Sequence, residues 1–184
     1  MNWMEDVAQR LASVSRPGVS PGEASRRAAV LVPLFVRDQT LWVVFTRRTE
    51  TVEHHRGQIS FPGGAEEPED TDLTETALRE TEEELGIRPQ DVKLLGPLSP
   101  IVTVTDFYVA PFVAAIPQPY VFAPAESEIA EVVEVPLGVL RDPAIKETRY
   151  LPDREGPVLF YRHGAHVIWG ATARILAELL EALE

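Results

Sequence analysis

Cysteine is absent from this chain of 184 residues. Its absence excludes a disulfide framework, a thiol nucleophile and a zinc site with cysteine ligands. Long apolar runs are absent too, since none reaches the roughly 18 residues that a membrane-spanning helix requires. The first residues, 1–6, contain neither the basic nor the apolar segment of a secretory signal peptide. We therefore expect a soluble, cytoplasmic protein.

Positive charge is scarce: 17 lysines and arginines face 29 aspartates and glutamates, which gives a net charge of −12. This excess repels nucleic acids and anionic membranes, so we expect neither as a partner. A small anionic substrate is then difficult to bind without metal ions and a few well-placed arginines. The apolar content of 45% suffices for a core, and the length predicts one domain over residues 1–184. The sequence leaves the oligomeric state, a homodimer included, open.

Four glutamates lie in the short segment from Arg79 to Glu84. Like charges this close repel one another and cost helix stability, unless a divalent cation that prefers carboxylate oxygens binds them. At about 100° per residue, Glu80, Glu83 and Glu84 share one side of a helix, whereas Glu82 points elsewhere into solvent. The core-facing side would comprise residues 73, 77, 78, 81 and 85. We infer a metal-binding face on an amphipathic helix.

This helix has start and stop signals. Asp72 can cap its N-terminus together with Glu75, three residues on, and Gly86 is a suitable residue just past its end. Three other interpretations compete for the acidic run. A solvated helix face is the usual fate of such runs. A calcium loop at residues 70–74 lacks the third ligand and the glycine of an EF-hand, and a P-loop at residues 63–64 lacks the Gly-Lys-Ser/Thr that must follow.

Together with Gly63 and Gly64, the acidic run resembles the Nudix box, whose pattern is Gly, five residues, Glu, seven residues, then Arg-Glu-apolar-x-Glu-Glu-x-Gly-apolar. The first half departs from this pattern, since Asp70 replaces the Glu and one extra residue follows it. The second half matches, with Thr81 in an apolar slot, at Arg79, Glu80, Glu83, Glu84, Gly86 and Ile87. The resemblance implies an α/β fold, the Nudix-type α/β/α sandwich with a mixed β-sheet, in which residues 63–87 form the box loop and helix.

The alternating pattern elsewhere in the chain suits this fold. Residues 1–27 read as an N-terminal helix, at 3–12, and a linker, and residues 37–40 read as a hairpin turn. A proline-rich loop is expected at 117–124. Further helices are expected at 136–141 and 171–183, strands at 28–36, 41–47, 92–95, 101–104, 107–116 and 129–135, and a hairpin at 158–169.

Segments on both sides of the box resemble the coenzyme A pyrophosphatase branch of the Nudix hydrolases. They are Phe45–Thr49, His55 and Gly57–Gly64 before the box, and Trp169–Ala173 near the C-terminus. The Asp and the longer spacer inside the box are also common in that branch. Glu53 departs from the signature, which usually has a basic residue there. If that position contacts a substrate phosphate, we expect the affinity or the choice of substrate to differ in this protein.

The chemistry of pyrophosphate cleavage assigns roles to the box residues. We predict Glu80 and Glu84 as the principal ligands of Mg²⁺ or Mn²⁺, with Glu83 sharing a metal or accepting the proton of the attacking water. Arg79 points away from the acidic side and is expected to orient a box carboxylate. Asp70 is expected to brace the loop.

The predicted substrate-binding residues flank these carboxylates. Arg47, Arg48 and Arg56 are candidates for phosphate contacts, and Gly63 and Gly64 are expected to allow a tight turn and a close backbone approach. Two alternatives are open for four of the other candidates. Residues His54 and His55 assist the reaction or cap a loop, Trp42 and Trp169 pack in the core or stack on adenine, and His163 and His166 are expected to be hairpin residues.

The resemblance implies metal-dependent hydrolysis of the pyrophosphate bond of coenzyme A or its derivatives, which gives 4′-phosphopantetheine and adenosine 3′,5′-bisphosphate. One alternative is a Nudix pyrophosphatase for another nucleoside diphosphate derivative, such as ADP-ribose or NADH. Another is a Nudix domain that binds a metal or ligand without turnover. The intact set of Arg79, Glu80, Glu83 and Glu84 argues against that last alternative.

Overall fold

The computed structural model describes residues 2–15, 26–50, 57–152 and 156–184. These residues form four α-helices, α1 (Trp3–Ser13), α2 (Leu73–Leu85), α3 (Leu137–Leu140) and α4 (Gly170–Ala182), with short 3-10 helices η1 (Pro89–Asp91) and η2 (Pro143–Ile145). The strands are β1 (Arg26–Arg37), β2 (Thr40–Arg48), β3 (Ile59–Ser60), β4 (Gly63–Ala65), β5 (Lys93–Pro97), β6 (Ile101–Val102), β7 (Phe107–Ala115), β8 (Ile129–Pro136), β9 (Lys146–Tyr150), β10 (Pro157–His163) and β11 (His166–Trp169).

A mixed sheet is built around the long strand β1. It pairs in parallel with β7 along one side and antiparallel with β2 at its C-terminal end. The N-terminal half of β1 pairs instead with β4. Strand β2 pairs with β8 from Trp42 to Arg48 and with β3 at Thr46 and Arg47. The segment that carries β3 and β4 therefore contacts both strands of the β1–β2 hairpin, which places Gly63 and Gly64 near the middle of the sheet.

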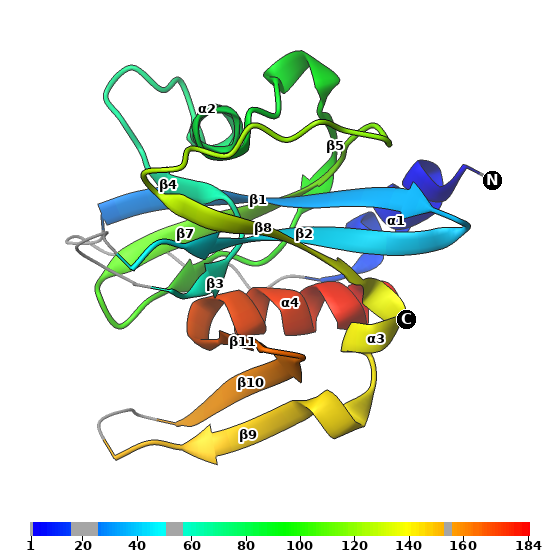
Figure 1. Ribbon diagram of the computed structural model, residues 1–184, viewed down its shortest axis with the longest axis vertical. Coiled ribbons are helices and arrows are strands. Elements are labelled where there is room, and N and C mark those ends of the chain that lie inside the picture. The colour runs from blue at the N-terminus through cyan, green and yellow to red at the C-terminus, as the bar shows by residue number, and fades with distance from the viewer. Residues whose placement is uncertain (1, 16–25, 51–56, 153–155) are drawn as a thin grey trace.

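Helices cover both faces of this sheet (Figure 1). On one face, Leu73 and Ala77 of α2 pack against β1 and β7, and Leu85 packs against Phe35 and Val44. On the other face, α1 and α4 contribute to a larger core that includes alternate residues of β1 and β2. This arrangement confirms the expected α/β/α sandwich with a mixed sheet. None of the described helices is long and apolar enough to cross a membrane.

A second sheet, β11-β10-β9, lies beyond α4 (Figure 1). The expected hairpin at 158–169 is confirmed as β10 and β11, with Phe160 paired to Trp169 and His163 to His166. The third strand, β9, was not predicted from sequence. Its residues Lys-Glu-Thr-Arg-Tyr are mostly exposed and lack an apolar face, so no periodicity marks them as a strand.

Most expected elements occur with shifted ends. The turn at 37–40 is confirmed, with Asp38 and Gln39 at φ of 50° and 61°. The linker does not extend to residue 27, because β1 already begins at Arg26, and residues 16–25 lie outside the described part. The tight turn expected at Gly63-Gly64 is wrong, since both residues belong to β4. The strand expected at 101–104 ends at Val102.

Candidate active site

Helix α2 starts and stops at the residues that the sequence indicates. The Asp72 carboxylate accepts a hydrogen bond from the Glu75 backbone N–H at 2.9 Å, and Gly86 ends the helix in the left-handed conformation at φ 69°. The predicted capping by Asp72 together with Glu75 differs from the structure in one detail. The Glu75 carboxylate accepts from the backbone and hydroxyl of Thr71, one residue before the cap. Both ends of the helix are thus fixed by short-range contacts.

The buried side of α2 contains polar residues that are locally satisfied. Thr81 is fully buried, and its hydroxyl donates to the Ala77 carbonyl at 2.7 Å. This bond explains how threonine occupies a slot that usually holds an apolar residue, because the hydroxyl remains paired inside the core. Thr76 is also fully buried and donates to the Asp70 carboxylate at 2.8 Å.

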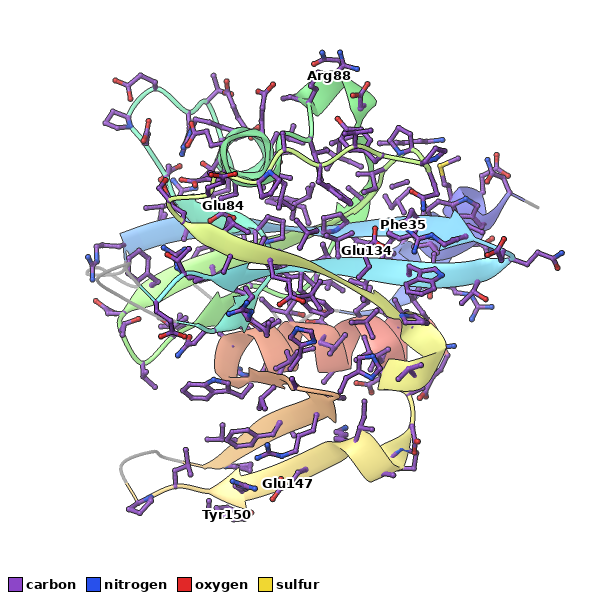
Figure 2. The ribbon with its side chains drawn as sticks, viewed as in Figure 1. Phe35, Glu84, Arg88, Glu134, Glu147 and Tyr150 are labelled. Atoms are coloured by element: carbon purple, nitrogen blue, oxygen red, sulfur yellow. The ribbon has the colours of Figure 1, made fainter. Side chains whose placement is uncertain are left out.

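Glu84 is the buried carboxylate of the acidic run, with 5% of its surface exposed. Figure 2 shows it between α2 and the sheet. The backbone N–H of Gly63 donates to its Oε2 at 3.2 Å, and an Arg48 nitrogen lies 3.6 Å from its Oε1. Burial outweighs both contacts and raises the pKa of Glu84 to about 7. The site therefore holds a carboxylate whose negative charge the protein compensates only in part.

Glu80 lies beside Gly64, and its carboxylate occupies the space that a side chain at position 64 would need. A Cβ atom added to Gly64 would lie 2.5 Å from the Glu80 carboxylate. A Cβ on Gly63, whose φ is 155°, would clash with the backbone of Ala29 in β1. The close backbone approach expected at the two glycines is therefore present, although the turn is not. Burial raises the pKa of Glu80, and a hydrogen bond from Arg79 opposes that effect.

Glu82 and Glu83 are both exposed, but they differ in their surroundings. The Glu83 carboxylate lies 3.4 Å from an Arg79 nitrogen, whereas Glu82 points into solvent as the helical periodicity predicts. The structure thus brings Glu80 and Glu84 to the inner side of α2 and leaves Glu83 at its rim. The side chain of Glu83 is 59% exposed, so it can reorient at little cost.

Arg79 is placed differently from the prediction that it points away from the acidic side. Its guanidinium donates to both oxygens of Asp70, at 2.9 and 3.0 Å, to the Ala65 carbonyl at 3.0 Å and to Glu80 at 3.0 Å. Arg79 therefore links the box loop to the acidic helix. A helical wheel predicts only the direction of the Cα–Cβ bond, whereas the long side chain of Arg79 extends toward Asp70.

Asp70 anchors the loop that precedes α2. Its side chain is 3% exposed and also accepts from the Glu67 backbone at 2.9 Å. The hydrogen bonds from Arg79, above all, hold the pKa of Asp70 well below its usual range, despite burial. Asp70 in turn raises the pKa of Arg79. This paired, buried carboxylate braces the loop.

The two arginines at the end of β2 point to opposite faces of the sheet, because successive strand residues alternate. Arg48 faces Glu84, and its Nε is buried without a hydrogen-bond partner among the described residues. Arg47 faces the other side and donates to Glu131 at 2.8 Å. Of these two predicted phosphate-binding residues, only Arg48 lies at the acidic cluster. The other candidates in this region, Glu53, His54, His55 and Arg56, lie outside the described residues.

One acidic residue near the cluster was missed by sequence reasoning. The charge of Glu128 contributes to the raised pKa of both Glu80 and Glu84. Its segment is attached to the site, since the Ala125 N–H donates to the Glu84 carbonyl at 3.0 Å and the Thr49 N–H donates to the Glu128 carbonyl at 2.8 Å. Glu128 follows a proline-rich loop without periodicity, so only the tertiary fold reveals its position.

The predicted ligands on α2, Glu80, Glu83 and Glu84, fit a hard divalent cation because all three are carboxylates. As the side chains stand, no three carboxylate or imidazole groups among the described residues converge closely enough to hold an ion. Arg79 provides the reason, since it draws Glu80 and Glu83 toward itself.

The described tryptophan and histidine candidates do not join the acidic cluster, and Trp42 packs against the core that contains Leu85 of α2. Trp42 stacks on Phe35, with ring centroids 6.1 Å apart, and Trp169 stacks on Phe160 at 6.0 Å. The two histidines belong to the β10–β11 hairpin, as expected. His166 additionally lies 3.1 Å from Glu131 and so joins the Arg47 pair.

Comparison with known proteins gives consistent results. A family model described as the NUDIX domain matches residues 25–154. A Pectobacterium atrosepticum protein named "Uncharacterized Nudix hydrolase NudL" is 37% identical over 182 residues, which cover 96% of this chain and 92% of that protein. A protein of the same name from Enterobacter sp. is 38% identical over 185 residues, with the same two coverages.

Solved structures share the architecture. A Caenorhabditis elegans Ap4A hydrolase in a binary complex has a TM-score of 0.53 and 18% identity, and the match covers 60% of this chain and 80% of that protein. A MutT/nudix family protein from Enterococcus faecalis has a TM-score of 0.55 and 16% identity, with coverages of 90% and 63%. At these identities the likeness shows the fold alone.

Proposed function

The chain belongs to the Nudix hydrolase family, enzymes that act on phosphoric anhydrides, and we propose that it hydrolyses the pyrophosphate bond of coenzyme A or its derivatives in a reaction that depends on Mg²⁺ or Mn²⁺. The products would be 4′-phosphopantetheine and adenosine 3′,5′-bisphosphate. The flanking segments Phe45–Thr49, Gly57–Gly64 and Trp169–Ala173 support this substrate, because they resemble the coenzyme A branch.

The buried carboxylate of Glu84 is the observation that most supports a metal-dependent reaction. A solvated helix face would leave all four glutamates in water, but Glu84 is buried and its pKa is raised to about 7. Retaining such a costly group makes sense where a cation compensates it. A bound Mg²⁺ or Mn²⁺ would neutralise phosphate oxygens and lower the pKa of a water molecule.

We assign roles to the residues around this carboxylate. Glu80 and Glu84 hold the cation, and the exposed Glu83 shares it or accepts the proton of the attacking water. Arg79 positions Glu80 and Glu83 from its anchor on Asp70. Arg48 lies on the sheet side of Glu84, where its guanidinium can contact a substrate phosphate.

The glycines and Glu128 complete the assignment. Gly63 donates its N–H to Glu84, and Gly64 leaves the space that Glu80 occupies. Glu128 adds a further negative charge that acts on both Glu80 and Glu84, so it can contribute to binding the cation. Arg56, which lies outside the described residues, remains a candidate for phosphate binding on the strength of its place in the sequence.

A substrate panel tests the proposal. It contains coenzyme A, an acyl-coenzyme A, ADP-ribose, NADH and a diadenosine polyphosphate, each with Mg²⁺ or Mn²⁺ and with a chelator. We expect the chelator to abolish turnover and coenzyme A to give the two products named above, identified by mass. Rapid turnover of ADP-ribose or NADH without turnover of coenzyme A would move the protein to another substrate class. No turnover of any substrate, together with metal binding, would favour a non-catalytic Nudix domain.

Matched variants on α2 test the assignment of residues. Glu84→Gln keeps the shape of the side chain and removes its charge, and Glu82→Gln does the same at an exposed neighbour. We expect the Glu84 variant to lose nearly all turnover and the Glu82 variant to retain it. Equal activity of the two variants would remove Glu84 from the site.

A further inference from the structure

A groove of about 490 Å³ lies on the face of β2 opposite to Glu84. Its walls come from the end of β2, the residues around β3, and the β10–β11 hairpin of the second sheet. Arg47 and Gln58 line it on the main-sheet side, and Phe160, Arg162 and Trp169 line it on the hairpin side. Figure 2 shows Glu147, the acidic partner of Arg162, on this second sheet and well apart from Glu84.

The groove is lined by basic side chains, and the carboxylates that contact them, Glu131 and Glu147, lie outside its described lining. Its described lining includes Arg47, Arg162 and His166 and no carboxylate, although the chain carries a net charge of −12. Glu131 joins Arg47 to His166, and the hydrogen bond from Arg47, above all, lowers the pKa of Glu131. These contacts hold the two basic side chains in place at the mouth of the groove.

Arg162 is the basic residue best able to receive a ligand. Its Nε lies 3.4 Å from Glu147, a long contact between side chains that are each more than two-fifths exposed. Such pairs contribute little stability. Glu147 also pairs with Arg149, which would still satisfy it if Arg162 turned toward an anion. A phosphate can therefore compete for Arg162 at small cost.

An aromatic wall lies next to Arg162. Phe160 and Trp169 are cross-strand partners, and their rings stack with planes within 8° of each other. Arg162 follows Phe160 by two residues in β10, so the guanidinium and the rings share one face of the hairpin. An aromatic wall beside cationic groups suits a nucleobase attached to a phosphate.

We propose that this groove binds the nucleoside 3′-phosphate end of the substrate, the adenosine 3′-phosphate unit if the proposed function, on which this inference rests, is correct. Arg162 and Arg47 contact the 3′-phosphate, and the Phe160–Trp169 wall lies against the base. Arg47 and Arg48 are neighbours in β2 that face this groove and Glu84 respectively. The substrate then spans the end of β2, with its pyrophosphate at α2 and its 3′-phosphate in the groove.

Nucleotide binding without metal tests the groove alone. With a chelator present, the carboxylates of α2 repel phosphates, so binding reports on the groove. Adenosine 3′,5′-bisphosphate and adenosine 5′-monophosphate are each titrated by calorimetry, with tryptophan fluorescence as a second readout. We expect the bisphosphate to bind at least tenfold more tightly, and Arg162→Gln to remove about tenfold of its affinity, the effect of one charge-assisted hydrogen bond. Arg174→Gln removes the same charge from an exposed residue outside the lining and should bind like the wild type.

Kinetics distinguish the subsite from the overall function. The proposal predicts that the wild type prefers coenzyme A to dephospho-coenzyme A, which lacks the 3′-phosphate, and that Arg162→Gln abolishes this preference through KM rather than kcat. Equal binding of the bisphosphate by the Arg162→Gln variant and the wild type would overturn the groove assignment. Failure of the wild type to hydrolyse either substrate would instead overturn the proposed function, and the binding titration would still decide the chemistry of the groove.

Discussion

The buried charge of Glu84 predicts an unusual dependence of stability on pH. Its pKa is raised from 4.5 to about 7 in the folded protein. The folded state therefore retains a proton that the unfolded chain releases above about pH 4.5. The free energy of unfolding of the metal-free protein should fall as the pH rises through this window. The full loss, reached above pH 7, is about 3 kcal/mol, since each pKa unit is worth roughly 1.36 kcal/mol.

Glu84→Gln isolates this effect. The variant keeps an oxygen that can accept from Gly63, and it has no charge to bury. Without metal, we expect it to exceed the wild type in stability by about 3 kcal/mol at pH 8 and to lose this advantage near pH 5. Urea unfolding of both proteins in a chelator from pH 5 to 8 measures the difference. Contributions from other carboxylates, such as Asp70, cancel because the two proteins share them.

Divalent metal should reverse the order of the two proteins at high pH. A cation that binds the ionised carboxylate stabilises the wild type by about 4.1 kcal/mol when its concentration is about 1,000 times Kd, which exceeds the deficit of about 3 kcal/mol. The Glu84→Gln variant should gain much less, and Glu82→Gln should behave like the wild type. A wild-type advantage or deficit that stays constant from pH 5 to 8 would refute the buried-charge reasoning. So would equal stabilisation of both proteins by Mg²⁺.

Three further predictions concern the groups around Glu84. Gly64→Ala displaces the Glu80 carboxylate, so kcat should fall about 100-fold with a near-normal melting temperature; unchanged kcat would contradict this. Asp70→Asn breaks the buried pair with Arg79 and should cost about 3 kcal/mol in urea unfolding at pH 7, whereas a loss below 1 kcal/mol would show that the pair is not needed. Because the pKa of Asp70 is lowered, that cost should shrink as the pH falls below 3.8. Arg48→Met should raise KM about tenfold; an unchanged KM would exclude it from phosphate binding.

The acidic helix could be predicted from sequence because its information is local. Periodicity separates Leu85 from Glu84, and Asp72 and Gly86 mark the two ends, as the structure confirms. The mixed sheet follows from the resemblance to the Nudix family, which the family match over residues 25–154 supports. Side chains alternate along β2, so Arg47 and Arg48 face opposite sides of the sheet. The prediction that both bind phosphate did not take this alternation into account.

Features that depend on contacts between distant segments could not be predicted. Arg79 turns toward Asp70 because the loop folds back over the start of α2, and nothing in the helical wheel records this. Glu128 approaches Glu84 only because its segment bonds to the C-terminal turn of α2. Strand β9 exists because the β10–β11 hairpin offers it an edge, since its own sequence lacks a strand pattern. In each case a tertiary partner supplied what local propensity did not.

Glu84 joins three separate segments, and its contacts decide how variants at this position can be interpreted. Its carboxylate meets Gly63 of the box loop and Arg48 of β2, whereas its carbonyl accepts from Ala125 in the segment that carries Glu128. A glutamine keeps the backbone contact and the acceptor for Gly63, so only the charge is lost. If that variant loses turnover while it gains stability without metal, the loss cannot come from unfolding or from release of the Glu128 segment. The buried charge itself would then be the feature that is retained for catalysis at the expense of stability.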